Sequence, residues 1–137
     1  MSKLQEQLKR HEGLRLKAYK CTANRTTIGY GRNLDDRGVT QAEADLMLEN
    51  DVLFLMSVLP EKILFFNELD KARADVLVNM AFNLGINGLL KFKKMIAAID
   101  GGYFNRAADE MLDSKWDRQV GDRALELAEQ MKTGEYK

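Results

Sequence analysis

The feature that most constrains the fold is a change of pattern within residues 11–32, HEGLRLKAYKCTANRTTIGYGR. A polar helical segment ends at Gly13, a residue that lets the backbone reverse at little steric cost. LKAYKC (16–21) and TTIGYG (26–31) then have the alternation and the β-branched and aromatic content of short strands. Joined by residues 22–26, the two segments predict a β-hairpin.

The length of this loop predicts which residues meet across the hairpin. A loop of five residues places Cys21 directly opposite Thr27, with Cβ atoms roughly 4.5–5.5 Å apart. Alternation puts Tyr19, Cys21, Thr27 and Gly29 on one face. Glu12 ends the preceding helix, so a carboxyl, a thiol and a hydroxyl are predicted to line one small cleft.

The spacing of these three residues resembles a known catalytic signature. Glu12, eight residues, Cys21, five residues, Thr27 and then IGYG are similar to the motif of the phage-type lysozymes, the muramidase endolysins of tailed bacteriophages in glycoside hydrolase family 24. Further stretches resemble the family's helical lobe: NMAFNLG (79–85), SKWDRQVGDRA (114–124) and TGEY (133–136).

The resemblance implies an α+β, lysozyme-like fold within a single domain, residues 1–137. It places a small β-hairpin lobe at about 12–40 and a larger helical lobe at about 60–137. A long helix at about 41–58 is expected to join the two lobes, with the substrate cleft between them.

The resemblance also implies a function. We expect an endolysin that hydrolyses the β-1,4 bond between N-acetylmuramic acid and N-acetylglucosamine in bacterial peptidoglycan for host cell lysis. It would act as a monomer without a cofactor, accumulate in the host bacterial cytoplasm and reach the periplasm and cell wall after a holin opens the membrane. Two alternatives stay open, a lytic transglycosylase that leaves 1,6-anhydro ends and a non-catalytic wall-binding module.

The resemblance assigns roles to the motif residues. Glu12 would be the general acid, although a lone glutamate at a helix end is otherwise a solvated charge. The family has Asp or Cys at the position of Cys21, which could be a base, a nucleophile or only a packing residue, so an inverting or a retaining outcome is open. Thr27 would hold the attacking water.

In the helical lobe, Phe82 and Asn83 match positions that line the saccharide cleft, and Arg123 matches an arginine that pairs with the catalytic glutamate. Core packing is the stronger alternative for Phe82, and a solvated charge is the alternative for Arg123. Arg32 stands where several family members have a histidine with a structural role.

Capping signals and periodicity predict the helices. Thr40 and Glu43 form a Thr-x-x-Glu capping box, in which each side chain satisfies a free backbone donor of the other residue. The helix that follows is expected to end before Pro60, and Gly85 is expected to end the most buried helix. The predicted helices span residues 3–11, 41–58, 68–84, 89–99, 103–112 and 123–132, with a loop at 33–38.

Charge and composition limit the function. Lys and Arg total 21, as do Asp and Glu, so nothing favours a nucleic-acid partner and any attraction to an anionic wall must come from a local patch. The single cysteine excludes an intramolecular disulfide. The sequence contains no apolar run for a signal peptide or membrane anchor and no metal-ligand cluster, so we expect neither membrane insertion nor a metal.

Overall fold

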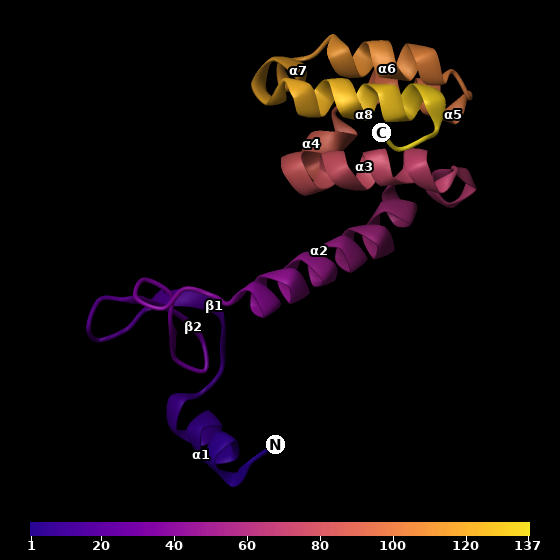
Figure 1. The fold of residues 1–137 in the computed structure, drawn as a ribbon. Coiled ribbons are helices and arrows are strands. Elements are labelled where there is room, and N and C mark those ends of the chain that lie inside the picture. Colours follow the sequence, from indigo (N-terminus) through magenta and orange to yellow (C-terminus); the bar gives the residue numbers. More distant parts are fainter. The chain divides into compact units, whose positions relative to one another are not determined.

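The computed structural model describes residues 1–137, and the chain forms two compact units, residues 1–47 and 48–137 (Figure 1). The first unit holds one helix and a small antiparallel sheet, and the second is helical. With eight α-helices and three short strands in the chain, the predicted α+β, lysozyme-like fold is confirmed. That residues 1–137 make one domain stays a prediction. None of the helices has the length and hydropathy that a membrane-spanning segment needs.

The first unit begins with α1 (Lys3–Glu12), which is one residue longer than predicted. Its start has a capping box that the sequence analysis missed. The Ser2 hydroxyl accepts from the Gln5 backbone N–H at 3.0 Å, and the Gln5 side chain accepts from the Ser2 N–H at 2.8 Å. Gly13, at φ 71°, ends the helix and turns the chain into the sheet.

The sheet has the strand order β1-β2-β3, with β1 (Arg15–Lys20), β2 (Thr26–Gly29) and β3 (Arg32–Asn33). The predicted hairpin is present, but β1 lies one residue earlier than the predicted 16–21, and β2 ends two residues before the end of the predicted 26–31. Strand β2 stops at Gly29 because a turn through Tyr30 and Gly31 reverses the chain into β3. The predicted strand 26–31 therefore included this turn, and β3 was not predicted, its Asn33 having been assigned to a loop.

The helix α2 (Gln41–Lys62) crosses the boundary between the two units. Its start confirms the predicted capping box. The Thr40 N–H donates to Oε1 of Glu43 at 2.8 Å, and the Glu43 N–H donates to the Thr40 hydroxyl at 3.2 Å.

The prediction that Pro60 ends this helix is wrong. Proline removes one backbone donor and crowds the carbonyl four residues earlier, which usually stops a helix. Here Leu59 and Ile63 are 0% and 2% exposed, and the Ile63 N–H donates to the Leu59 carbonyl at 2.7 Å. Because core packing on both sides of Pro60 holds the last turn, the helix continues to Lys62.

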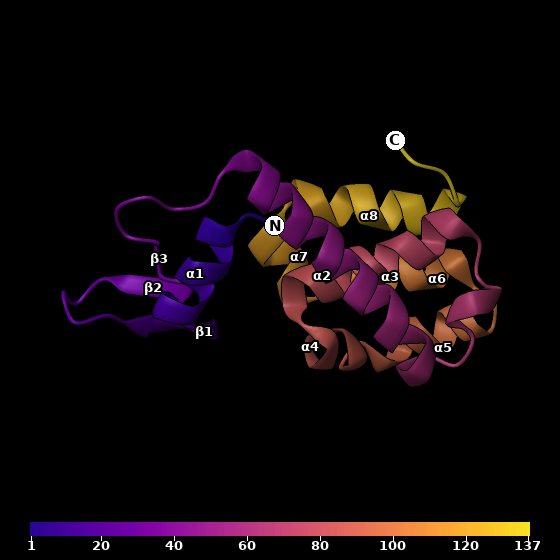
Figure 2. The same cartoon turned by 90° about the horizontal axis from the view of Figure 1, so that it is seen from below.

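The second unit is a cluster of helices in which α8 packs against α3, α6 and α7, and α6 also packs against α5 (Figure 2). The predicted helix 68–84 starts at residue 71, because Asp70 caps it by accepting from the Arg73 N–H. The predicted helix 89–99 is two helices, and α7 was not predicted. The elements are a short 3-10 turn (Phe66–Glu68), α3 (Lys71–Leu84), α4 (Ile86–Leu90), α5 (Lys93–Asp100), α6 (Phe104–Leu112), α7 (Lys115–Val120) and α8 (Asp122–Thr133).

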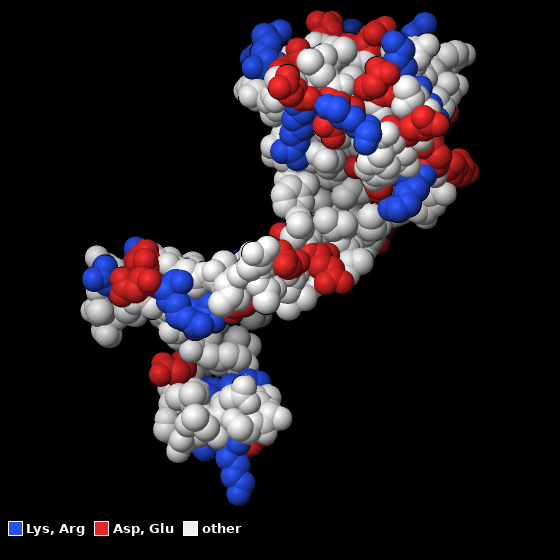
Figure 3. Space-filling view, viewed as in Figure 1, with Lys and Arg blue, Asp and Glu red and all other residues white.

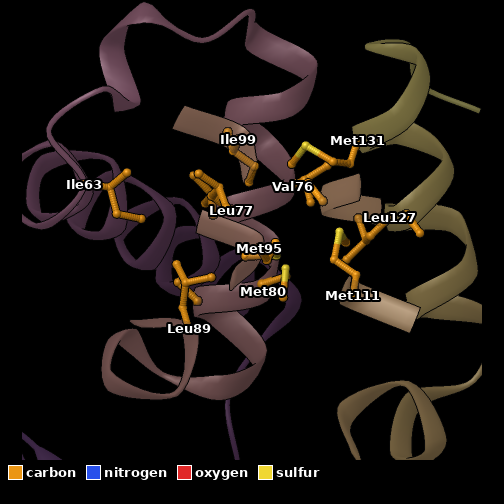
Figure 4. Close-up of a cluster of buried hydrophobic side chains, with 14 of the residues drawn as sticks. Ile63, Val76, Leu77, Met80, Leu89, Met95, Ile99, Met111, Leu127 and Met131 are labelled. Atoms are coloured by element: carbon orange, nitrogen blue, oxygen red, sulfur yellow. The ribbon is translucent and has the colours of Figure 1, made fainter. Parts of the chain in front are cut away.

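The core of this unit lies around α3, which buries more side chains than any other helix, as predicted. Gly85, at φ 79°, ends α3 as expected. Figure 4 shows aliphatic and methionine side chains from several helices directed toward one another. The methionines fill the core as predicted, since unbranched thioethers adapt to irregular space. The largest fully buried side chains are Leu59, Val76, Leu77, Met80, Leu89, Met95, Met111 and Met131.

A polar contact, here called the Arg73 clamp, joins the start of α3 to the C-terminal end of α8. The Arg73 guanidinium donates from Nε to the Met131 carbonyl at 2.6 Å and from its terminal nitrogen to the Lys132 carbonyl at 2.9 Å. It also lies 3.7 Å from the centre of the Phe104 ring. Arg73 thus supplies donors to carbonyls at the C-terminal end of α8, where a positive charge also complements the helix dipole.

Candidate active site

Glu12 is the last residue of α1, and its side chain lies against the turn between β2 and β3. A Cβ atom placed on Gly31 would be 3.0 Å from Oε2 of Glu12 and 3.3 Å from its Cδ. Gly31 also has φ of 80°, a conformation that residues with a side chain rarely adopt. The second glycine of IGYG therefore makes room for the Glu12 carboxyl, a role that the sequence analysis did not assign.

The predicted pairing of Cys21 with Thr27 is wrong by two residues, because the partner of Thr27 is Tyr19. Thr27 lies opposite Tyr19, and Lys20 lies opposite Thr26. The loop is therefore 21–25 rather than 22–26, and the Cys21 N–H donates to the Arg25 carbonyl at 3.0 Å. Two adjacent threonines can both start a strand, so alternation alone does not decide the register.

Cys21 and Thr27 nevertheless stay neighbours on one face, as predicted. Thr27 shares the face of Tyr19, its direct partner, and Cys21 follows Tyr19 by two residues. Such diagonal neighbours lie within reach of each other across a strand pair.

Thr27 is 4% exposed, and its hydroxyl donates to the Arg25 carbonyl at 2.9 Å. The same carbonyl accepts from the Cys21 N–H, so the Arg25 backbone fixes both residues. Because the single hydroxyl proton of Thr27 is used in this bond, its oxygen lone pairs remain as acceptors. Thr27 is thus arranged to accept a hydrogen bond from a ligand or a water.

The Cys21 thiol is half-buried at the start of the loop. Backbone hydrogen bonding from Arg25 and then Ala23, with a smaller contribution from the Thr27 hydroxyl, lowers the pKa of the thiol below its ordinary value. The Thr27 proton cannot serve both the sulfur and the Arg25 carbonyl, and the 2.9 Å contact assigns it to the carbonyl. The backbone groups of the loop therefore carry the effect, which favours the reactive thiolate.

The helical-unit residues of the predicted site have the following neighbours. Phe82 is 47% exposed, so core packing does not explain it. The side-chain oxygen of Asn83 accepts from Nε1 of Trp116 at 2.8 Å. Arg123 donates from Nε at 3.0 Å and from a terminal nitrogen at 2.7 Å to the side-chain oxygen of Asn79. It is therefore held in place rather than free in solvent, and its pairing with Glu12 stays a prediction.

Two of these residues, Phe82 and Arg123, line the same groove of about 370 Å³ within the second unit. Phe82 and Arg123 line it together with apolar side chains of α2 and α3, and Asn79 lies between them on α3. Asn79 and Trp116 could not be identified from the sequence, because each acts through a partner far away in the chain. A larger groove, of about 540 Å³, follows α8 and holds none of the predicted site residues.

Nothing in the structure groups three or more His, Cys, Asp and Glu side chains in a way that could hold a metal ion.

A family model described as phage lysozyme matches residues 9–132, a range that contains every predicted site residue. The chain belongs to the phage lysozyme family. It is therefore a lysozyme-type cell wall hydrolase, and the suspected resemblance is confirmed.

Individual relatives have low identity but extensive coverage. Probable T4-type lysozyme 1 of Dictyostelium discoideum is 26% identical over 163 residues, covering 98% of this chain and 96% of the relative. An endolysin of Acyrthosiphon pisum secondary endosymbiont phage 1 is 31% identical, over 81% of this chain and 75% of its own length. An endolysin of Bacillus phage B103 is 33% identical, over 83% of this chain and 44% of its own.

Proposed function

We propose that this lysozyme is a muramidase that hydrolyses the β-1,4 bond between N-acetylmuramic acid and N-acetylglucosamine in bacterial peptidoglycan. The observation that supports this most is the place of Glu12, whose carboxyl lies against the Gly31 backbone next to the hairpin. Cys21 and Thr27 share one face of the same hairpin. An acid and a base are the groups that hydrolysis of a glycosidic bond requires, and Thr27 adds an acceptor for the attacking water.

In the proposed reaction, protonated Glu12 donates its proton to the glycosidic oxygen as the bond to the anomeric carbon breaks. The developing oxocarbenium-like centre then accepts a water oxygen. That water loses a proton to the Cys21 thiolate, so the site returns to its starting charge after proton exchange with solvent. If the water enters on the face opposite the leaving oxygen, this route inverts the anomeric carbon.

Thr27 orients the water in this scheme. Its hydroxyl proton is bonded to the Arg25 carbonyl, which leaves oxygen lone pairs to accept one hydrogen of the water. The other hydrogen would go to the Cys21 sulfur, where the lowered pKa of the thiol favours the thiolate as acceptor. With both hydrogens held, a lone pair of the water can face the anomeric carbon.

We propose further that Phe82 and Asn83 contact the saccharide, and that Arg123 acts on Glu12 as a positioning residue. The biological role would be host cell lysis by a phage endolysin, released from the host cytoplasm to the wall through a holin. Two relatives that carry the name endolysin support this role.

The test is the product released from purified sacculi by wild type and by Glu12→Gln. A muramidase releases reducing ends with muramic acid at the new terminus, and Glu12→Gln should release almost none. Mass analysis that finds 1,6-anhydro ends would assign a lytic transglycosylase instead. Sacculi that bind the protein without any release of product would indicate a wall-binding module.

A further inference from the structure

The zero net charge of this chain conceals a strong separation of charge along the sequence. Residues 1–34 hold eight Lys and Arg against two Asp and Glu, whereas residues 35–137 hold thirteen against nineteen. Figure 3 shows acidic and basic side chains mixed over the helical unit. The excess of positive charge is thus confined to residues 1–34, the segment that carries Glu12, Cys21 and Thr27.

Two of these cations lie close to the predicted site. Lys9 is half-buried one helical turn before Glu12, and its ammonium lies 5.1 Å from the centre of the Tyr30 ring. Because residues three apart share a helix face, Lys9 and Glu12 both face the turn that contains Tyr30 and Gly31.

Arg15 follows Glu12 by three residues, and its guanidinium lies 4.7 Å from the centre of the Tyr19 ring. Tyr19 is the cross-strand partner of Thr27, so Arg15 lies on the face of the hairpin that bears Thr27.

Neither Lys9 nor Arg15 has a carboxylate partner. The ion pairs of the structure involve Arg25, Arg32, Lys71 and Arg73. Contact with an aromatic face orients a cation without neutralising it. Both charges therefore remain available to an anion that approaches Glu12.

We propose that Lys9 and Arg15 bind carboxylates of the short peptides that branch from the wall glycan. This inference rests on the proposed function, because the glycan that brings its glycosidic bond to Glu12 also brings its peptides there. Their carboxylates recur along the strand, which matches two fixed cations on either side of Glu12 in the chain. Lys9 and Arg15 would thus let an electrically neutral protein select peptide-bearing glycan.

The test measures binding rather than turnover, so that it is separate from the test of the proposed function. Glu12→Gln is the parent protein, because it is expected to bind sacculi without degrading them. Its Kd is measured on native sacculi and on sacculi whose peptide carboxyls have been amidated with a carbodiimide and a neutral amine. Lys9→Gln with Arg15→Gln removes the two cations, and Lys93→Gln with Lys94→Gln is the control with the same change of charge on exposed α5 positions.

We expect the Lys9/Arg15 variant to bind native sacculi roughly two- to tenfold more weakly than the parent, the range expected of exposed charge pairs. Amidation should weaken the parent and the α5 control by a similar factor and leave the Lys9/Arg15 variant unchanged. The ratio of the two Kd values within each variant does not depend on how much of the sample is folded. Equal losses in the Lys9/Arg15 variant and the α5 control, or an equal effect of amidation on all three proteins, would overturn the inference. The proposed function is tested separately, by measuring the reducing ends that wild type releases from sacculi.

Discussion

Arg32 binds the carboxylate of Glu43 with both terminal nitrogens, at 2.7 and 2.6 Å, and also donates to the Gly38 carbonyl at 3.1 Å. Glu43 is at the same time the acceptor of the Thr40 N–H at the start of α2. One carboxylate therefore links strand β3 to the first turn of α2. The residue that replaces the histidine of several family members thus has a structural partner, which the sequence alone did not indicate.

This pair predicts a specific loss of stability in acid. Bonding from Arg32, and then from the Thr40 backbone, lowers the pKa of Glu43 from 4.5 to about 2. The stabilisation is complete above 4.5, where both the folded and the unfolded chain have an ionised Glu43, and it is lost as the pH falls toward about 2. Glu43→Gln should lower the Tm near neutrality, and the difference from wild type should shrink through this window. A difference in Tm that does not change with pH would contradict the assignment.

The first turn of α2 gives a second prediction about stability. Thr40→Ala removes the hydroxyl that accepts the Glu43 N–H and should cost roughly 0.5–2 kcal/mol in the free energy of unfolding. Thr22→Ala, at an exposed loop position, is the matched control. Urea unfolding of the two variants measures the difference, and equal midpoints would mean that the cap contributes nothing in solution.

Glu12→Gln tests the general acid. The amide has the size of the carboxyl but cannot donate its proton, so kcat should fall by roughly 10²–10⁴-fold or more. The Tm should not fall with it, because groups placed for catalysis are often neutral or costly for stability. Glu6→Gln, on an exposed turn of the same helix, should keep its activity. Turnover near that of wild type in Glu12→Gln would remove this motif from the mechanism.

Alanine substitutions at Gly31 and Gly29 test whether Gly31 makes room for the Glu12 carboxyl, with Gly29 as the matched control. Both have positive φ, at 80° and 70°, so alanine at either position strains the backbone by roughly 1–2 kcal/mol. A Cβ at Gly29 meets open space, whereas one at Gly31 meets the Glu12 carboxyl. Gly31→Ala should therefore lose about 10²-fold in kcat beyond Gly29→Ala, because a displaced acid donates poorly. If both variants lose turnover equally, strain alone is responsible.

The Cys21 series tests the base. Cys21→Ser keeps the shape but loses the acidity, so its turnover should fall at least tenfold at every pH, whereas Cys21→Asp should stay active because other family members have aspartate there. If the thiolate is required, activity of wild type should be lost on the acid side at higher pH than in Cys21→Asp, whose carboxyl has an ordinary pKa of about 3.9. If Cys21→Ser and Cys21→Ala have the same dependence of turnover on pH as wild type, the thiol only fills space and is not the base.

Local signals in the sequence predicted the parts of the fold that depend on neighbouring residues. Thr40 with Glu43 identified a helix start, and Gly85 a helix end, because capping involves groups within one turn. The length of α2 could not be predicted in the same way. Pro60 is a reliable local stop, but the packing of Leu59 and Ile63 against residues distant in sequence outweighed it.

In the candidate site, too, local spacing predicted the contacts between near neighbours but not those between residues distant in the chain. Spacing brought Glu12, Cys21 and Thr27 together, since a short hairpin leaves few arrangements for residues so close in the chain. The partner of Thr27 was missed by two residues because Thr26 and Thr27 both suit a strand start. The bond from Arg123 to Asn79 spans 44 residues, and nothing in the local pattern of either residue indicates it.

The clamp of Arg73 on the end of α8 has a consequence for how the helical unit is made. Arg73 and its carbonyl acceptor at Met131 are 58 residues apart, and helices α4 to α7 lie within the loop that this contact closes. Met131 itself belongs to the core. During synthesis, α4 to α7 would leave the ribosome before α8 is available to pack against them. Their apolar faces would be uncovered during that time. The helical unit can therefore close only once α8 has left the ribosome, and until then its emerging helices depend on whatever in the cell shields them from aggregation.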